Sequence, residues 1–111
     1  MSFAEALPAA TKAEINQLFT ALETSNCEFS RNGIWYSAYK ASGHLHRKYD
    51  YLLRKGLVTT TESFIKLAAT QSSTTGKLYF VRCDNKEPVL SNFWLIGKLK
   101  EIRRLPLNIN N

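Results

Sequence analysis

Five polar side chains in the middle of this 111-residue chain have the chemistry of an anion site. Arg31 and Lys48 are cations, His44 stands four residues before Lys48, and Ser72 and Ser73 follow in a polar run. Because residues i and i+4 lie on one side of a helix, His44 and Lys48 should face the same way. Cationic and hydroxyl donors together suit a carboxylate, a phosphate or a sulfate. We therefore predict that these five residues form a ligand-binding site.

The same group has a second interpretation, in which it holds the fold together. Arg31 would cap the C-terminus of a helix or pair with a carboxylate, and His44 would hydrogen-bond the serine-rich turn. Polar clusters of this kind are often structural networks. The sequence leaves the structural clasp and the binding site both open.

Catalysis and nucleotide binding have weaker support in the sequence. The run from Ser72 to Lys77 lacks the glycine spacing of a phosphate-binding loop, and Leu78 stands where such a loop has Ser or Thr. A small hydrolase using His44, a serine and an acid such as Glu62 remains an alternative, although no G-x-S-x-G motif is present. We expect no enzyme and no cofactor.

The two histidines and two cysteines do not have the spacing of a metal site. His44 and His46 are two residues apart and point different ways on a helix, and Cys27 and Cys83 are far apart in the chain. An even cysteine count in an exported chain instead favours a disulfide, which would place the protein outside the cytosol. The alternative is two buried thiols that pack as small hydrophobic groups.

The net charge of +6, from 15 basic and 9 acidic residues, favours acidic partners. A cytosolic nucleic-acid-binding protein is therefore a further alternative. Its basis is a mixture of basic and aromatic residues between positions 39 and 55. These basic residues are spread around the predicted helix and match no DNA-reading motif, so we expect no nucleic-acid partner. No apolar run approaches the roughly 20 residues that cross a bilayer.

Hydrophobic spacing predicts four helices, at about 12–24, 38–55, 62–70 and 92–104. Capping boxes are expected at Thr11 with Glu14 and at Thr59 with Glu62, and Ser37 should cap the second helix. Alternation predicts strands at 27–31 and 78–83, with a tight turn at Asn32-Gly33. If these two strands pair, Cys27 and Cys83 meet in one sheet, as a bridge requires.

These elements predict a compact α+β single domain, mostly helical, with about four helices and a small two- or three-stranded antiparallel sheet. The domain should span residues 11–105, between a disordered N-terminal remnant at 1–10 and a loose tail at 106–111. Ser2-Phe3-Ala4 has the small-x-small pattern that precedes signal cleavage, which suggests that an export signal has been removed. The alternative is the native start of a cytosolic protein. We expect a monomer.

Four segments in order resemble the YfeK-like family of small exported proteins of Gram-negative bacteria, which has no assigned function. They are Cys27-x-Phe29-x-Arg31-Asn32-Gly33, Ala41-x-x-His44-Leu45-x-x-Lys48-Tyr49, Thr61-Glu62-x-Phe64-Ile65 and Ser72-Ser73-x-Thr75-Gly76-x-x-Tyr79. The resemblance implies a periplasmic or envelope location. Together with the predicted polar site, this location leads us to expect a non-catalytic module that binds a protein partner or an anionic envelope ligand. The resemblance implies no catalytic residue. No cysteine lies near the start of the chain, so the resemblance does not extend to the lipid anchor of some members.

Overall fold

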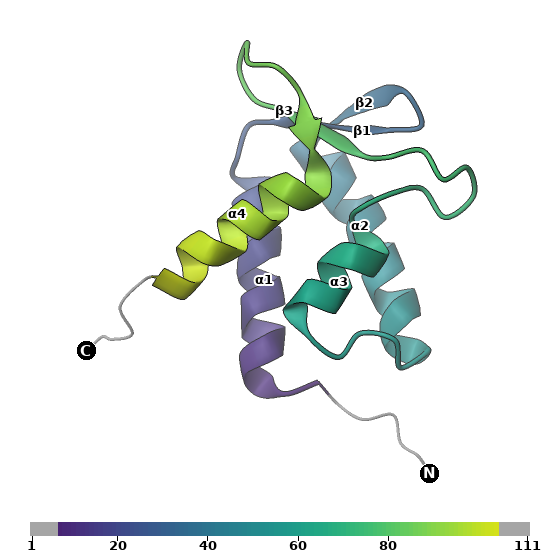
Figure 1. Cartoon of the computed structure of the whole chain (residues 1–111), viewed down its shortest axis with the longest axis vertical. Coiled ribbons are helices and arrows are strands. Elements are labelled where there is room, and N and C mark those ends of the chain that lie inside the picture. The colour runs from purple at the N-terminus through teal and green to yellow at the C-terminus, as the bar shows by residue number, and fades with distance from the viewer. Residues whose placement is uncertain (1–6, 105–111) are drawn as a thin grey trace.

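A computed structural model describes residues 7–104, and the chain order of the elements is helix, two strands, two helices, two strands, helix (Figure 1). The helices are α1 (Ala9–Glu23), α2 (Ala38–Arg54), α3 (Thr61–Ala68) and α4 (Ser91–Arg104). The strands are β1 (Glu28–Arg31), β2 (Ile34–Ser37), β3 (Phe80–Arg82) and β4 (Val89–Leu90). This architecture confirms the predicted α+β class, with one strand more than the largest sheet expected.

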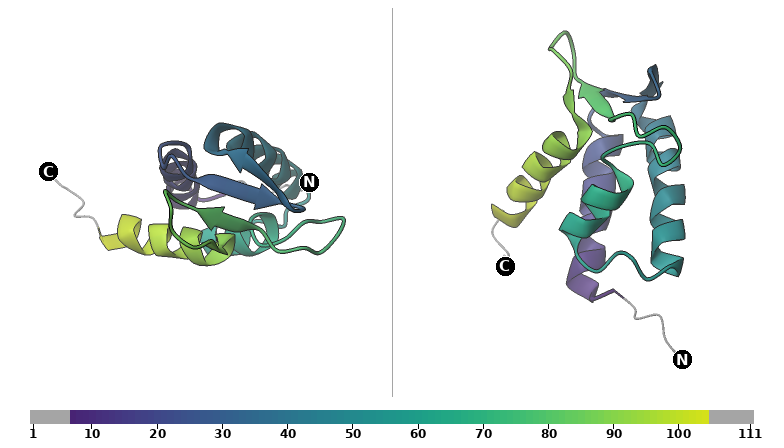
Figure 2. Two further views of the ribbon diagram at one scale, coloured as in Figure 1. Left: turned by 90° about the horizontal axis from the view of Figure 1, so that it is seen from above. Right: turned by 45° about the vertical axis from the view of Figure 1, so that its right-hand side comes forward.

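The four strands form one antiparallel sheet in the order β2-β1-β3-β4. It lies across one end of the helices, as Figure 1 and the left view of Figure 2 show. Asn32 and Gly33 have φ angles of 53° and 83°, so the predicted tight turn joins β1 to β2. The predicted pairing of the two distant strands is also confirmed, since Phe29 of β1 lies opposite Val81 of β3.

Directly beyond this pairing, Cys27 and Cys83 form a disulfide. Their Cα atoms are 4.3 Å apart, although the residues are 56 positions apart in the chain. The bridge is possible because β1 and β3 are neighbours in the sheet. The covalent link therefore closes a loop that contains β2, α2, α3 and the polar turn at residues 72–77.

The hydrophobic core is formed by the inner faces of the helices and one face of the sheet. The predicted stripe on α1 is entirely buried, and it consists of Ile15, Leu18, Phe19 and Leu22. Phe64 of α3, Val81 of β3 and Leu95 of α4 are 0–1% exposed and meet this stripe in the same core. Burying each such side chain contributes about 2 kcal/mol, so this core is the main stabilising term.

One of the three predicted helix caps is confirmed, and the other two differ in the structure. Ser37 caps α2 as expected, because its Oγ accepts the N–H of Lys40 at 3.2 Å. The capping box of α3 is formed by Thr60 and Ser63, one residue after the predicted pair. No side chain caps α1, which begins at Ala9. Residues 9 and 10 are therefore helical, although they belong to the predicted disordered remnant, while residues 1–6 and the predicted tail at 106–111 lie outside the described part.

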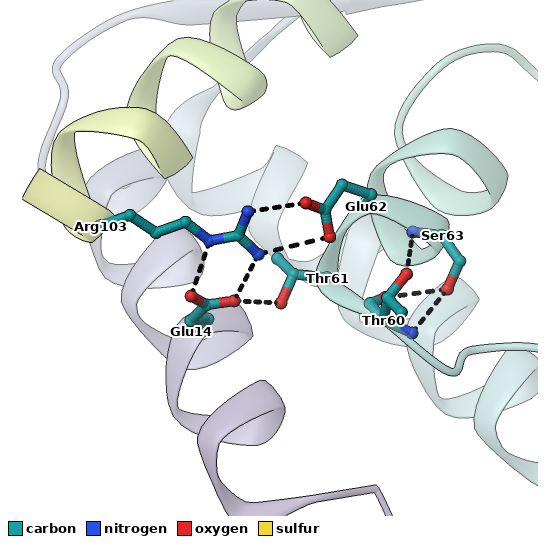
Figure 3. Close-up of polar contacts among 6 residues, drawn as sticks. All are labelled: Glu14, Thr60, Thr61, Glu62, Ser63 and Arg103. Atoms are coloured by element: carbon teal, nitrogen blue, oxygen red, sulfur yellow. Dashed lines mark hydrogen bonds and ion pairs between the residues drawn. The ribbon is translucent and has the colours of Figure 1, made fainter.

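Glu14, which was predicted to cap its own helix, instead belongs to a network that joins three helices (Figure 3). Arg103 of α4 donates to Glu14 of α1 at 2.9 and 3.0 Å and to Glu62 of α3 at 2.7 and 3.3 Å. Thr61, which is 1% exposed, also donates to Glu14 at 2.6 Å. The guanidinium lowers the pKa of both carboxyl groups by hydrogen bonding. The network thus connects α1, α3 and α4.

In residues 7–104, no helix has the length and apolar character needed to cross a membrane.

Candidate anion-binding groove

The positions of the predicted site residues follow from two elements of the fold and one turn. Phe29 and Arg31 point to the same face of β1, since side chains alternate along a strand, and Phe29 is buried against the helices. Arg31 therefore emerges beside α2 at the end of the sheet. On α2, His44 and Lys48 are one turn apart and face the same side. The polar turn then brings Ser72 and Ser73 to the opposite wall.

All five predicted residues line one groove of about 350 Å3, which we call the cationic groove. Its other lining residues are Arg47, Tyr51, Leu52, Leu67, Thr74 and Tyr79. The groove thus has three positively charged side chains, a histidine and several hydroxyl groups. The structure brings the five residues together, as the first interpretation of the sequence requires.

Lys48 is the most constrained cation of the groove. Its Nζ donates to the carbonyl oxygen of Gln71 at 3.0 Å and to the hydroxyl of Tyr79 at 3.3 Å, and it lies 5.1 Å from the centre of the tyrosine ring. Burial, and secondarily the charge of Arg31, lowers the pKa of Lys48. Burial raises the pKa of Tyr79, so its hydroxyl stays protonated at neutral pH. The ammonium group is thus held in place by neutral acceptors.

His44 lies beside Lys48 and contacts the sheet. Its ring meets the edge of Tyr36 with a centroid distance of 4.9 Å and an interplanar angle of 89°. Burial lowers the pKa of His44, and the charges of Arg31, Arg47 and Lys40 lower it further. The three cations that act on the imidazole indicate a positive potential at this point.

No acidic side chain balances this charge within residues 7–104. The ion pairs there involve Arg82, Lys98 and Arg103, and none involves Arg31, Arg47 or Lys48. No Asp or Glu lines the groove either. Gathering cations without a counter-charge costs free energy in the folded state, and an anion would offset this cost.

The second interpretation, the structural clasp, describes part of the same region. The Oγ of Ser72 accepts the N–H groups of Thr74 and Thr75, both at 3.3 Å, so this hydroxyl stabilises its own turn. Thr75 also donates to the side chain of Asn32 at 2.6 Å, which fastens the turn to the β1-β2 hairpin. The clasp interpretation expected His44 to hydrogen-bond the serine-rich turn. Lys48 holds this region instead, because its Nζ donates to the carbonyl oxygen of Gln71, directly before the turn. Ser72 is therefore structural, whereas Ser73 is exposed and makes no side-chain hydrogen bond within the described residues.

An apolar cavity of about 50 Å3 lies next to the groove. Leu22, Phe29, Ala41, Leu45, Ala68 and Ala69 supply its apolar wall. Arg31, His44, Lys48 and Tyr79 line both the cavity and the groove, so they form the rim where the two meet. Two serines, Ser30 and Ser91, also line the cavity, and the hydroxyl of Ser30 already accepts the N–H of Phe80 at 3.2 Å. Polar and apolar binding surfaces are thus adjacent.

Three charged or aromatic residues of the groove were missed as site residues. Arg47 and Tyr51 continue the spacing of His44 and Lys48 on α2, at three and seven residues from His44, so helical periodicity was sufficient to find them. Tyr79 had no such signal, because its place opposite Lys48 depends on the path of the chain from α3 to β3.

The cationic groove lacks the side chains that the metal and hydrolase alternatives require. Residues 7–104 contain no group of three or more His, Cys, Asp and Glu side chains that could hold a metal ion. His46 stacks on Phe19 with ring centroids 3.6 Å apart, so it lies on the α1 side of α2, away from His44. The hydrolase alternative requires an acid beside His44 and a serine, and no Asp or Glu lines the groove.

Fold and site together define a small disulfide-bonded α+β domain with a cationic groove at one end of its sheet. The chain belongs to the family of unknown function DUF5329, whose model matches residues 9–103. The match covers all four helices almost completely and includes the whole groove. No curated protein and no solved structure matches this chain.

Proposed function

We propose that this protein is a non-catalytic binding module of the bacterial envelope and that it holds an anionic ligand in the cationic groove. The ligand contributes a carboxylate, sulfate or phosphate group, which Arg31, Arg47 and Lys48 neutralise. His44 and the exposed hydroxyl of Ser73 complete the donors.

The observation that carries this proposal is the uncompensated charge of the groove. Three cations line it, and no carboxylate in residues 7–104 lies within ion-pair distance of them. By contrast, Arg103 is paired with two carboxylates, and Arg82 is paired with Glu28 at 2.8 Å. Pairing is thus available elsewhere in the fold and absent where the cations converge.

The envelope location is supported by the disulfide and by the resemblance to exported YfeK-like proteins. A bridge between residues 56 positions apart persists in an oxidising compartment and is reduced in most cytosols. The test is fractionation of cells that express the full native gene, followed by an intact mass of the protein after alkylation of free thiols. Recovery in the cytosol with two alkylated cysteines would contradict the location.

The test of the groove is a titration of the oxidised protein with inorganic phosphate and with sulfate, followed by backbone amide shifts. We expect shifts at the groove residues, which weaken as the ionic strength rises. Arg31→Gln should lower the affinity about tenfold, because a hydrogen bond to a charged group is worth about 1.5 kcal/mol.

The matched control is Arg54→Gln, which removes one positive charge from the exposed last turn of α2 without touching the groove. Its affinity should stay within about twofold of the parent protein. An equal loss in both variants would indicate a general charge effect, and shifts confined to another face would place the anion elsewhere; either result contradicts the proposal.

A further inference from the structure

We propose that the ligand of the cationic groove is a small amphipathic anion, whose acidic group lies between Arg31 and Lys48 and whose short apolar arm enters the adjoining cavity. This inference rests on the proposed function and adds the class of ligand.

The first step is the shared rim. Arg31, His44, Lys48 and Tyr79 line both the groove and the cavity. An anion held by Arg31 and Lys48 therefore lies at the mouth of the cavity. An apolar group attached to that anion can enter the cavity without leaving the cations.

The second step is the chemistry of the cavity wall. Six apolar side chains from α1, β1, α2 and the end of α3 supply most of it. The hydroxyls of Ser30, Tyr36 and Ser91 also line it, and that of Ser30 already accepts the N–H of Phe80. A mainly apolar wall offers a buried polar group few hydrogen-bond partners, whereas it takes an apolar group readily. The wall thus favours a hydrocarbon group over a second polar group. This preference distinguishes the proposed ligand from inorganic phosphate or a sugar phosphate.

The third step is size. The cavity has about 50 Å3, and a water-sized group needs roughly 10–15 Å3 by the same measure. About three to five non-hydrogen atoms therefore fit. The arm is a short alkyl or small branched chain, and a long lipid tail would have to leave the cavity.

The experiment is a titration of the oxidised full chain with linear alkanoates from acetate to octanoate at constant pH and ionic strength. Each methylene that enters the cavity should raise the affinity about fourfold. We expect the gain to stop after about four methylenes, when the cavity is full. In the parent protein, hexanoate but not acetate should shift the methyl signals of Ala68 and Leu45.

Ala41→Leu tests the cavity directly, because the substitution adds three carbon atoms at a partly buried wall position. The variant should bind all alkanoates with the same affinity, whatever their chain length, and its affinity for phosphate should be unchanged. Ala13→Leu, on the exposed face of α1, is the matched control and should keep both properties. The methyl shifts of the parent protein decide the question even if Ala41→Leu fails to fold.

The outcomes separate the two proposals. Phosphate binding with equal affinity for all alkanoates overturns the amphipathic ligand and leaves the anion site standing. A gain that continues to octanoate, or methyl shifts far from Ala68 and Leu45, also overturns the cavity as the place of the arm. If neither phosphate nor any alkanoate binds at the groove, both proposals are wrong.

Discussion

Removing the disulfide should cost a large share of the stability of this domain. The perturbation is Cys27→Ala with Cys83→Ala, which avoids placing a new hydroxyl at Cys27, a position that is only 5% exposed. The bridge spans 56 positions, and for a loop of that length the restriction of the unfolded chain is worth about 4 kcal/mol. Folded domains of this size are stable by about 5–15 kcal/mol in total, so the change is readily measured.

The assay is equilibrium unfolding in urea, followed by tryptophan fluorescence and by circular dichroism. Trp94 packs edge-on against Phe29 with ring centroids 5.5 Å apart, so its emission reports the contact between α4 and the sheet. With a urea dependence of about 2 kcal/mol per molar, the midpoint should fall by about 2 M. The oxidised parent protein is compared with the reduced parent protein, which lacks the bridge but keeps both sulfur atoms.

Each single substitution already breaks the bridge, so Cys27→Ala and Cys83→Ala should each cost nearly as much as the double variant. Additive losses would show that the two cysteines contribute through packing and not through their bond. A loss of less than about 1 kcal/mol on reduction would refute the reasoning from chain closure.

Three further predictions concern charge. Arg103→Met should destabilise the fold by about 1–2 kcal/mol in thermal unfolding, because it breaks hydrogen-bonded ion pairs to two helices, whereas Arg104→Met, in the same exposed last turn, should change the stability by less than about 0.5 kcal/mol. Since the pKa values of Glu14 and Glu62 are lowered in the folded state, their stabilisation is present above the ordinary pKa of 4.5 and is lost as the pH falls through the folded values. Urea unfolding from pH 7 to pH 3 should show this loss in the parent protein and a smaller one in Arg103→Met; equal slopes would contradict the network. Because burial and neighbouring cations lower the pKa of His44, sulfate, whose charge does not change near neutral pH, should raise that pKa and bind more tightly at lower pH. Imidazole NMR signals can follow this change, and an unchanged His44 pKa would place the anion away from it.

Local features of the fold were predictable because their causes lie within a few residues. The stripe on α1, the turn at Asn32-Gly33 and the cap at Ser37 each depend on neighbours in sequence, and the structure confirms all three. The cap of α3 was misplaced by one residue. Thr59 and Thr60 are chemically equivalent as caps, so the sequence does not distinguish them. In the structure Thr60 is the cap, and Thr61, the first residue of α3, donates to Glu14 of α1.

The misplaced elements have long-range causes. The strand Val89–Leu90 was missed because two residues carry no periodic signal, and it exists through its pairing with β3. Glu14 was assigned to a local capping box, but its partners Thr61 and Arg103 are 47 and 89 residues away. No local rule can detect such partners, since the folded chain alone brings them within hydrogen-bond distance.

The sequence by itself determined the class of fold, because strand alternation and helical spacing follow from local patterns. It also favoured the disulfide and singled out the five polar residues that line the groove. Only the tertiary structure decided that Ser72 stabilises its own turn, that Tyr79 completes the groove, and that an apolar cavity opens beside the cations. The physical reason is that a cavity and a surplus of charge belong to no single segment. The cavity forms where side chains of several elements meet, and the positive potential forms where their cations converge. Both therefore exist only in the assembled fold.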